Sequence, residues 1–510
     1  MRKTFARTVG VLFVYLVASG HVGSPDTWFE GNAGPYHVTV QVTTAGVVPG
    51  VANIYVRAIG DVPDKVTVQA NKFDATGGAP PPEPATAAEG DPGLFAGKLW
   101  IMSGGSNSVT VNVSGPKGGG KVVVPVVVVA YSRLKLDKPM GFGLAIMGVV
   151  LFAGLVTIVG AAVRESVIPP GQLPTPSTRN RARLAMGITS VLLVAAIAGG
   201  WRWWNSEDAS YVNSIFKPMA AIALVDSTAP ARLRFVITEP AWTHRSDSAW
   251  IRKNGRNSWT PLVEDHGKLV HLFLVKETNG TFAHLHPASN DSIAFSAELP
   301  PIAPGKYRVF ADIVHESGYT QTLVTSVEVP QRSPAPASPV TDPDDSWFVG
   351  RVSPNVRVFR LLDGATMEWL NDGIPIVAGK PAPMRFVVRN PDGSNATLEP
   401  YMGMAGHAVV AREDGEVFVH LHPMGTISMA SQMAFAMRTP GDTIRGQLGK
   451  RVSEAEMSQM HQATISSNIV SFPYAFPKPG DYRIWVQIRH NGQVQTGAFA
   501  MRVPADTKDN

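Results

Sequence analysis

Cysteine is absent from all 510 residues of the chain. Its absence excludes disulfide bonds, thiolate zinc sites, iron–sulfur clusters, covalently attached c-type haem and a cysteine nucleophile. It also excludes the blue-copper centre, which needs a thiolate ligand. Histidine and methionine remain as nitrogen and soft sulfur donors for a metal, and the folded domains must be stabilised by their cores alone.

Charged residues are also scarce. Only 17% of the residues are charged, the net charge is +5, and the lysines and arginines are scattered rather than gathered in a basic stripe with aromatics. This pattern gives no support for nucleic-acid binding. We find no Ser-His-Asp order, paired-carboxylate motif, phosphate loop or dinucleotide fingerprint. The low charge, together with 44% hydrophobic residues, indicates membrane segments.

Residues 1–20 have the pattern of a secretory signal peptide. Arg2, Lys3 and Arg7 precede an apolar run at residues 9–17, and small residues at 18–20 offer a cleavage site. An uncleaved anchor is the alternative. Both readings predict that the chain following this segment is exported.

Two longer apolar stretches predict a transmembrane hairpin at residues 140–204. The first, residues 141–163, is uncharged and of spanning length; the second, residues 184–200, is followed by an aromatic belt of three tryptophans. The loop at 164–183 carries four arginines against one acid, so the positive-inside rule makes it cytoplasmic. We therefore expect a bacterial inner (cytoplasmic) membrane protein whose large domains are periplasmic or otherwise extracytoplasmic.

Residues 21–139 predict a β-sandwich, because alternating runs such as 37–42 and 109–113 are separated by Gly and Pro turns. The Pro/Ala/Gly-rich stretch 77–92 predicts a flexible loop. The order of a Gly-Pro-Tyr strand start, a Pro-Gly turn, a Leu-Phe-Ala-Gly strand and a Gly-rich hairpin resembles the small YtkA-like and FixH-like envelope domains. This resemblance covers about a quarter of the chain.

The remaining chain contains a repeat. Phe-Ala-His-Leu-His-Pro at 282–287 recurs as Phe-Val-His-Leu-His-Pro at 418–423, and two further segments match: 231–237 with 382–388, and 304–310 with 479–485. Short alternating strands predict an immunoglobulin-like sandwich for each copy. The copies occupy 205–330 and 346–510, with a linker at 331–345 and a partly helical insertion at 439–467. The predicted fold is thus mainly β, with three immunoglobulin-like sandwiches outside the membrane and a two-helix transmembrane hairpin.

Each repeat carries four histidines at matching positions. Turn residues between the first two predict a β-hairpin in each copy. A two-residue Asp414-Gly415 turn places His407 opposite His422, with His420 on the same face. In the first copy, any even register places His271 on the face of His284 and His286, whereas an odd bulge would break this arrangement. The fourth histidine ends an apolar strand face, where a neutral imidazole can be a ligand. The expected sets are His271, His284, His286 and His315, and His407, His420, His422 and His490.

Methionines distinguish the two sets. Met402, Met404 and Met424 flank the second, whereas the first has Asp265, His266 and Lys268 in the stretch equivalent to 402–407. Thioethers favour Cu(I), and imidazole with carboxylate favours Cu(II) or Zn(II). We therefore expect the second repeat to prefer Cu(I) and the first to prefer Cu(II) or Zn(II). The alternative is that the repeated histidines form a structural hydrogen-bonding network.

A further site is predicted at the start of the exported chain. Cleavage after Gly20 would leave His21 as the first residue, with its amine and ring available to one metal, and His37 as a second imidazole. Such a site resembles that of the CopC-like copper carriers, although the later Asp-x-His pair is not found here. The alternative is that His21 simply lies near a cleavage site.

These patterns predict a membrane-anchored envelope protein that binds copper, or zinc as an alternative metal, for handling, delivery or sensing. Its expected setting is the membrane, with a copper-dependent envelope or respiratory complex as partner and no nucleic acid. Two other classes stay open. A three-histidine site with an open coordination position would make the chain a metal-dependent enzyme, which we consider the less favoured reading. Tandem sandwiches without metal would make it an interaction scaffold.

Overall fold

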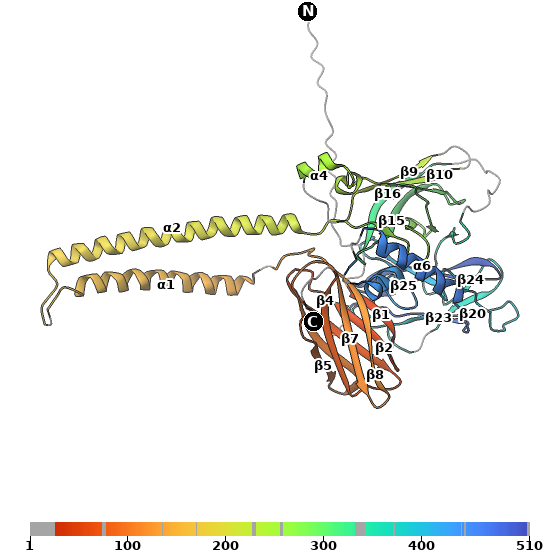
Figure 1. Ribbon diagram of the computed structural model, residues 1–510, viewed down its shortest axis with the longest axis horizontal. Coiled ribbons are helices and arrows are strands. Elements are labelled where there is room, and N and C mark those ends of the chain that lie inside the picture. Colours follow the sequence, from red (N-terminus) through yellow and green to blue (C-terminus); the bar gives the residue numbers. More distant parts are fainter. Residues whose placement is uncertain are drawn as a thin grey trace, which may run out of the picture. The chain divides into compact units, whose positions relative to one another are not determined.

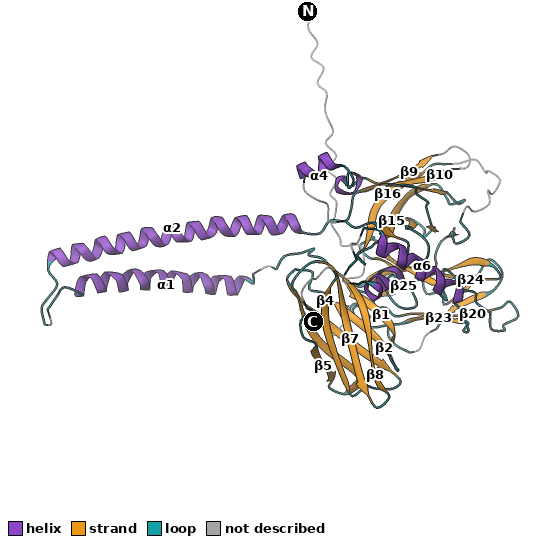
Figure 2. Ribbon diagram, in the orientation of Figure 1, coloured by secondary structure: helices purple, strands orange, loops and turns teal. Residues whose placement is uncertain are grey.

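The computed structural model describes residues 26–73, 78–134, 136–169, 171–226, 231–254, 259–331, 342–370, 373–439, 441–442 and 445–506. The chain forms two compact units: residues 46–48 with 129–217, and the rest. The first of these is helical and the second is mainly β (Figures 1 and 2). The predicted signal segment and His21 lie outside the described residues.

The helical unit is a hairpin of two long helices, α1 (Lys138–Glu165) and α2 (Pro176–Ser214). Both are long and apolar enough to cross a membrane, and their apolar side chains are largely exposed. The Thr175 hydroxyl accepts a hydrogen bond from the Thr178 backbone N–H, and Pro176 occupies the first turn, both of which favour a helix start. Gly160 lets the helices approach closely, because a Cβ there would lie 2.6 Å from Met186. The two predicted spans are therefore both present as helices.

The N-terminal domain is an eight-stranded antiparallel sheet with the order β1-β2-β3-β6-β5-β4-β7-β8. Alternation along β2 buries Val38, Val40 and Val42 and leaves their neighbours half-exposed. The stretch 77–92, predicted to be a flexible loop, contains β5, which pairs with both β4 and β6. The strands are β1 (Asp26–Ala33), β2 (Tyr36–Thr43), β3 (Gly50–Ile59), β4 (Lys65–Lys72), β5 (Glu83–Ala88), β6 (Asp91–Ile101), β7 (Gly105–Gly115) and β8 (Gly118–Val128).

The first repeat has two sheets enclosing one core. Leu233 and Phe235 from one sheet pack with Leu272, Leu274 and Val309 from the other. One sheet has the order β14-β10-β9, and in the other β15 pairs with β11, β12 and β16. The elements are β9 (Ala221–Asp226), β10 (Arg232–Ile237), α3 (Pro240–Thr243), α4 (Ser248–Asn254), β11 (Leu262–Val263), β12 (His271–Lys276), β13 (Phe282–Leu285), β14 (Ala294–Glu298), β15 (Gly305–His315) and β16 (Thr320–Val329).

The second repeat also encloses a core between two sheets, β18-β19-β20-β23 and β22-β21-β24-β25. A short strand, β17 (Ser346–Phe348), precedes it and pairs with β13 of the first repeat, so the chain crosses between the two repeats. The remaining strands are β18 (Val358–Arg360), β19 (Thr366–Trp369), β20 (Met384–Arg389), β21 (His407–Arg412), β22 (Phe418–Leu421), β23 (Ile469–Phe472), β24 (Gly480–His490) and β25 (Gln493–Val503).

The two repeats share an apolar interface formed by the outer faces of their β12 and β21 sheets. Phe310 and Phe418 stack with ring centroids 3.9 Å apart, and Phe282 stacks on Trp485 at 4.7 Å. Phe273 lies 5.2 Å from Phe418. Strands β12 and β21 are therefore buried on both faces, one toward their own core and one toward the other repeat. This explains why they are almost continuously apolar rather than alternating.

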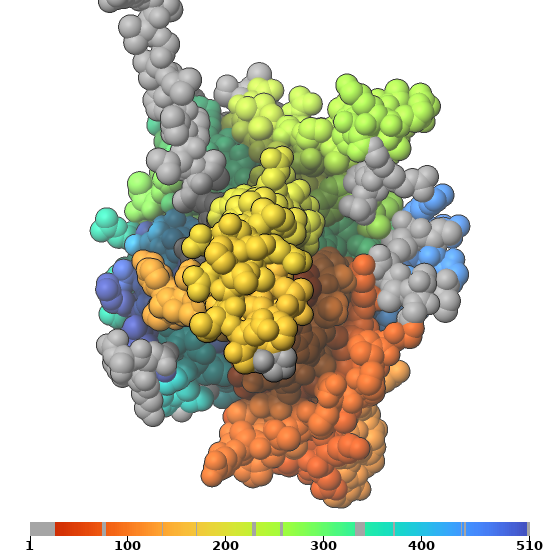
Figure 3. Space-filling model, turned by 90° about the vertical axis from the view of Figure 1, so that its left-hand side faces the viewer, coloured from red at the N-terminus to blue at the C-terminus, as the bar shows by residue number. Residues whose placement is uncertain are grey.

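Two helices lie between β22 and β23 of the second repeat: α5 (Met429–Met437), which precedes the predicted insertion, and α6 (Gln447–Gln462), which lies within it. Met429, Met433 and Met437 follow one another at four-residue spacing along α5, and this helix packs against Phe73 and Val314. Residues 26–128, red to orange in Figure 3, also meet this repeat, because Glu30 donates its backbone N–H to the Met424 carbonyl at 2.8 Å.

Candidate metal centre

Seven of the thirteen histidines gather in one buried cluster at the end of the inter-repeat interface. Neighbouring ring centroids are 4.4 to 6.1 Å apart. The most exposed ring, His420, has only 9% of its surface accessible. The members are His266, His271, His284, His286, His407, His420 and His422.

Hairpin register places three of these rings on one face in each repeat. In the second repeat, β21 and β22 pair Ala408 with Leu421 and Val409 with His420, which sets His407 against His422. The three rings are then 4.6 to 5.4 Å apart. The parity expected from the Asp414-Gly415 turn is therefore what the structure shows. The first repeat has the same register, with Phe273 opposite His284.

The two hairpins face each other, so the two expected sets form one centre rather than two separate ones. His271 lies 5.3 Å from His420, and His284 lies 5.5 Å from the same ring. Donor atoms that lie within 4.8 Å of one another form two groups of three histidines: His271, His284 and His286, and His266, His407 and His422. The second group mixes the repeats. The expectation of one independent set per repeat is thus corrected.

Each repeat orients a histidine of the other. Oδ2 of Asp312, on β15, lies 3.4 Å from Nδ1 of His420. Oε1 of Gln487, on β24, lies 3.0 Å from Nδ1 of His284. Asp312 pairs with His271, and Gln487 pairs with His407, so these two residues occupy matching positions. Such outer partners fix the ring orientation. Nε2 of His420 has no hydrogen-bond partner of normal geometry among the described residues, whereas Nε2 of His284 lies 3.1 Å from Nδ1 of His271.

Two other rings are held in the same way. His286 Nδ1 lies 2.9 Å from Asp345 Oδ1, and His422 Nδ1 lies 2.9 Å from the Ile427 carbonyl. The Nε2 atoms of His286, His420 and His422 have no hydrogen-bond partner of normal geometry among the described residues, and neither ring nitrogen of His407 has one. Buried imidazole nitrogens without a partner are costly unless a ligand satisfies them.

Burial keeps these imidazoles neutral. It is the main cause that lowers the pKa of His407, His284, His286 and His420 well below the usual value, and the neighbouring imidazoles add to the effect. Burial, with His420 next to it, lowers the pKa of His422 to about 3. A neutral imidazole is the form that binds a metal. The cluster is therefore in its metal-binding form at neutral pH.

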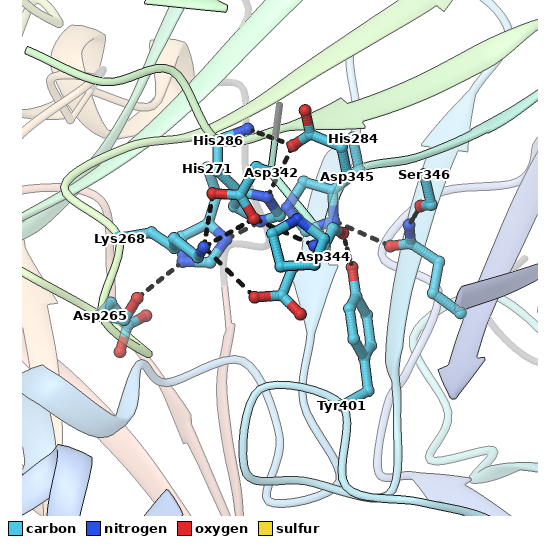
Figure 4. A network of polar contacts seen from close by, with 12 residues as sticks. Asp265, Lys268, His271, His284, His286, Asp342, Asp344, Asp345, Ser346 and Tyr401 are labelled. Carbon is cyan, nitrogen blue, oxygen red and sulfur yellow. Dashed lines mark hydrogen bonds and ion pairs between the residues drawn. The ribbon is translucent and has the colours of Figure 1, made fainter. Parts of the chain in front are cut away.

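The end of the linker closes one side of the cluster through a network of acids (Figure 4). Lys268 Nζ bonds to Asp342 at 2.6 Å and lies 3.2 Å from Asp344. Asp345 also accepts the His286 backbone N–H at 2.8 Å. Burial and the adjacent Asp342 raise the pKa of Asp345 to about 7. A cation on His286 would favour the ionised form of Asp345, which in turn strengthens its hold on the ring.

Two matching turns complete the centre. Asp265 and Lys268 exchange backbone hydrogen bonds, as do Tyr401 and Met404, and the inner residues of both turns have positive φ. His266 and Met402 are the non-glycine residues at these positions, with φ of 55° and 49°. A histidine or methionine in this conformation is uncommon and strained, which points to a role for the side chain or its position.

The structure separates the expected fourth histidines from the cluster. Cross-strand partners share a face, so His271 lies on the face of Asp312, and His315, three residues further along β15, lies on the opposite face. His315 instead bonds to Thr260 O at 2.8 Å and to Gln321 at 3.0 Å. This correction applies equally to His490, three residues beyond Gln487, which bonds to Asp363 at 2.5 Å.

The other expected ligands are placed as follows. Met402 and Met404 are buried in the 401–404 turn, and Met424 is half-buried. His37 bonds to Asn32 at 2.9 Å and to Glu30 at 3.2 Å on the N-terminal sheet.

Sequence reasoning used His266 with Asp265 to predict the metal preference of the first repeat but did not include His266 in either set of four histidines. It stands five residues before His271, as Met402 stands five before His407. That repeat alignment was the available signal. It did not reveal that the His266 turn would reach the histidines of the other repeat.

Comparisons with known proteins give a family match without a function. A family model described as a domain of unknown function, DUF8832, matches residues 243–331, 360–446 and 449–505. These segments contain all seven clustered histidines. No curated protein matches the chain.

Two of the solved structures that match have low sequence identity and low TM-scores. Latent PorU from Porphyromonas gingivalis is 9% identical, covering 94% of this chain and 34% of its own, with a TM-score of 0.12. Salmonella alpha-2-macroglobulin is 10% identical, covering 95% of this chain and 24% of its own, with a TM-score of 0.19. The chain thus spans about a third and about a quarter of these two proteins. With TM-scores this low, neither similarity carries an argument about fold or function.

Proposed function

We propose that this chain is a membrane-anchored extracytoplasmic protein that binds copper, or a similar transition metal, in its buried histidine cluster. The observation that carries the proposal is that Nε2 of His286, His407, His420 and His422 and Nδ1 of His407 have no hydrogen-bond partner of normal geometry within the described part of the chain. Burying so many polar atoms without partners is unfavourable for a purely structural network. A metal ion bound to them removes that cost.

The donor chemistry favours copper with zinc as the competitor. Imidazole suits both metals, and affinity for nitrogen sites rises toward Cu(II). The two groups of three histidines provide for two ions in one centre. Such a centre would join the two repeats, because His266 of the first groups with His407 and His422 of the second.

The burial of the histidine cluster favours a role in binding a metal over a role in catalysis. A catalytic zinc site keeps an open position for water or substrate, which requires access. Here every ring of the cluster is at least nine-tenths buried. Metal handling, delivery or sensing therefore fits the cluster better than a hydrolytic enzyme. A partner that delivers or receives the metal in the envelope is part of this proposal.

Metal content of the full chain in detergent is the direct test. We expect about two copper ions per chain, one for each histidine group. His422→Ala and His284→Ala should each lower the copper content, whereas His244→Ala, at an exposed histidine outside the cluster, should leave it unchanged. A wild-type chain that binds neither copper nor zinc would contradict the proposal and favour the scaffold.

The proposed orientation rests on the arginines of the α1–α2 loop. Reporter fusions at Gln172 and after Asp506 should report the cytoplasmic and the extracytoplasmic side respectively. Both reporters on one side would disprove this topology while leaving the metal proposal intact.

A further inference from the structure

A third group of donors lies beside the histidine cluster and has a different chemistry. Asp265, His266 and Glu456 place their donor atoms within 4.8 Å of one another, and all three residues are buried. Asp265 and His266 come from the first-repeat turn, and Glu456 comes from α6 of the insertion. The group therefore combines two carboxylates and one imidazole from two separate parts of the chain.

The buried side chain of His266 distinguishes this group from a simple pair of carboxylates. Its exposed fraction is 1%, and neither of its ring nitrogens has a hydrogen-bond partner of normal geometry among the described residues. Its Nε2 lies 3.9 Å from Asp265 Oδ1. His266 also belongs to the group with His407 and His422. A neutral imidazole has one unprotonated nitrogen, so a ring that binds an ion in each group must lose its remaining N–H proton to solvent and bridge the two ions as an imidazolate.

Among the described residues, neither Asp265 nor Glu456 has a lysine or arginine paired with its carboxylate. Glu456 is fully buried, and Asp265 is 4% exposed. Lys268, on the same turn as Asp265, directs its ammonium group to Asp342 and Asp344 instead. Two adjacent buried carboxyl groups are unfavourable when ionised unless a positive charge lies between them.

Helix α6 is held against both turns that border the centre. A Cβ on Gly267 would lie 3.3 Å from Met457 Sδ, and a Cβ on Gly403 would lie 3.2 Å from Met460 Cα. Both glycines also have positive φ. A side chain at position 267 or 403 would therefore obstruct the packing of α6 on these turns. This packing fixes Glu456 over the His266 turn.

We infer that Asp265, His266 and Glu456 form a separate binding site for a divalent cation of Zn(II) type, adjacent to the copper-binding histidines. Carboxylate oxygen with imidazole nitrogen is a donor set that zinc accepts and Cu(I) disfavours. The insertion of the second repeat thereby supplies a ligand, Glu456, that has no counterpart in the first repeat. The inference rests on the proposed metal-binding function only in that His266 is shared with the histidine group.

The test uses the full chain in detergent, first saturated with Cu(I) under reducing conditions and then titrated with Zn(II) alone. Wild-type protein should bind one zinc ion per chain in addition to copper. Its zinc absorption-edge spectrum should show a mixed oxygen and nitrogen shell at about 2.0–2.2 Å. Glu456→Gln should weaken zinc binding by more than about 100-fold, since loss of outer-shell partners alone costs about 10- to 100-fold. Copper content should stay unchanged.

Glu454→Gln is the matched control, because Glu454 lies on the same helix and its side chain is 67% exposed. Asp265→Asn provides a second variant that should also lose the zinc, in case Glu456→Gln perturbs the helix. A zinc-dependent rise in melting temperature, present in wild type and absent in both site variants, reports the site independently of the titration.

Three outcomes would overturn the inference: no zinc in copper-saturated wild type, unchanged zinc affinity in Glu456→Gln, or a zinc shell of imidazole alone. The first is expected if Asp265 and Glu456 share a proton instead of a cation. Each of these leaves the copper content intact, whereas failure of the proposed function would appear as absence of copper from the wild-type chain.

Discussion

Asp312 of the first repeat lies 3.4 Å from Nδ1 of His420 in the second. The reciprocal contact, from Gln487 of the second repeat to His284 of the first, measures 3.0 Å. Each repeat therefore controls the ring orientation of a histidine that belongs to the other. This exchange makes the histidine cluster a property of the pair of repeats, and neither copy contains a complete centre.

Asp312→Ala should weaken copper binding without abolishing it. The carboxylate orients His420 from outside the donor set, and loss of such a partner lowers metal affinity by about 10- to 100-fold. Chelator competition on the full chain measures the change. Asp392→Ala, which removes an exposed acid of the second repeat, is the control and should leave affinity unchanged. Equal affinities of Asp312→Ala and wild type would show that the contact does not orient the ring.

Copper should stabilise the folded protein, because the centre exists only when the two repeats are docked. At a free copper concentration 100 times the dissociation constant, we expect about 2.7 kcal/mol of added stability. The measurement is the melting temperature of the mainly β unit in the full chain, with and without a chelator. His284→Ala should show a smaller copper-dependent shift than wild type. A shift of the same size in this variant would place the stabilising copper elsewhere.

Several parts of the centre follow from local rules and others do not. Strand parity places His407, His420 and His422 on one face, because cross-strand partners and residues two apart share a face in any regular hairpin. The same rule excludes His315 once the partner of His271 is known to be Asp312. That partner depends on the register of two strands far apart in sequence, which composition and periodicity do not determine.

The joining of the two sets could not be predicted for a different reason. Strands β12 and β21 are apolar on both faces, and a continuous apolar run does not say what covers its second face. The burial of Glu456 could not be predicted from the sequence either, since a single glutamate on an amphipathic helix is more often a solvent-facing residue. Its burial arises only from the packing of α6 on the Asp265 turn.

Phe418→Ala should destabilise the protein and weaken metal binding together. Its ring stacks on Phe310 at 3.9 Å and lies 5.2 Å from Phe273, so truncation leaves a cavity in the inter-repeat interface. Removal of a buried phenylalanine costs about 3–5 kcal/mol. Chemical denaturation and copper competition measure the two effects. Tyr55→Ala, at a 39%-exposed aromatic of the N-terminal sheet, is the control and should change neither. A stable variant with full copper affinity would show that the repeats dock independently of this contact.

The last prediction concerns His315, which lies outside the histidine cluster. Burial lowers its pKa to about 4, and the ring is held neutral between the Thr260 carbonyl and the Gln321 amide. In the unfolded chain its pKa returns to about 6.5. The unfolded state therefore binds the extra proton first as the pH falls. The contribution of this group to stability is complete above pH 6.5 and is lost as the pH falls from about 6.5 to about 4.

His315→Gln keeps a hydrogen-bonding side chain at this position but removes the titrating group. The unfolding free energy of wild type should fall more steeply than that of the variant across this window. The difference should approach about 3 kcal/mol at its acid end, from about 1.4 kcal/mol per pKa unit. Denaturant unfolding at a series of pH values, with chelator present in both samples, measures the two curves. His244→Gln, at an exposed histidine, should follow the wild-type curve. Parallel curves for His315→Gln and wild type would mean that His315 is protonated as readily in the folded protein as in the unfolded chain, which its burial between Trp242 and Trp259 argues against.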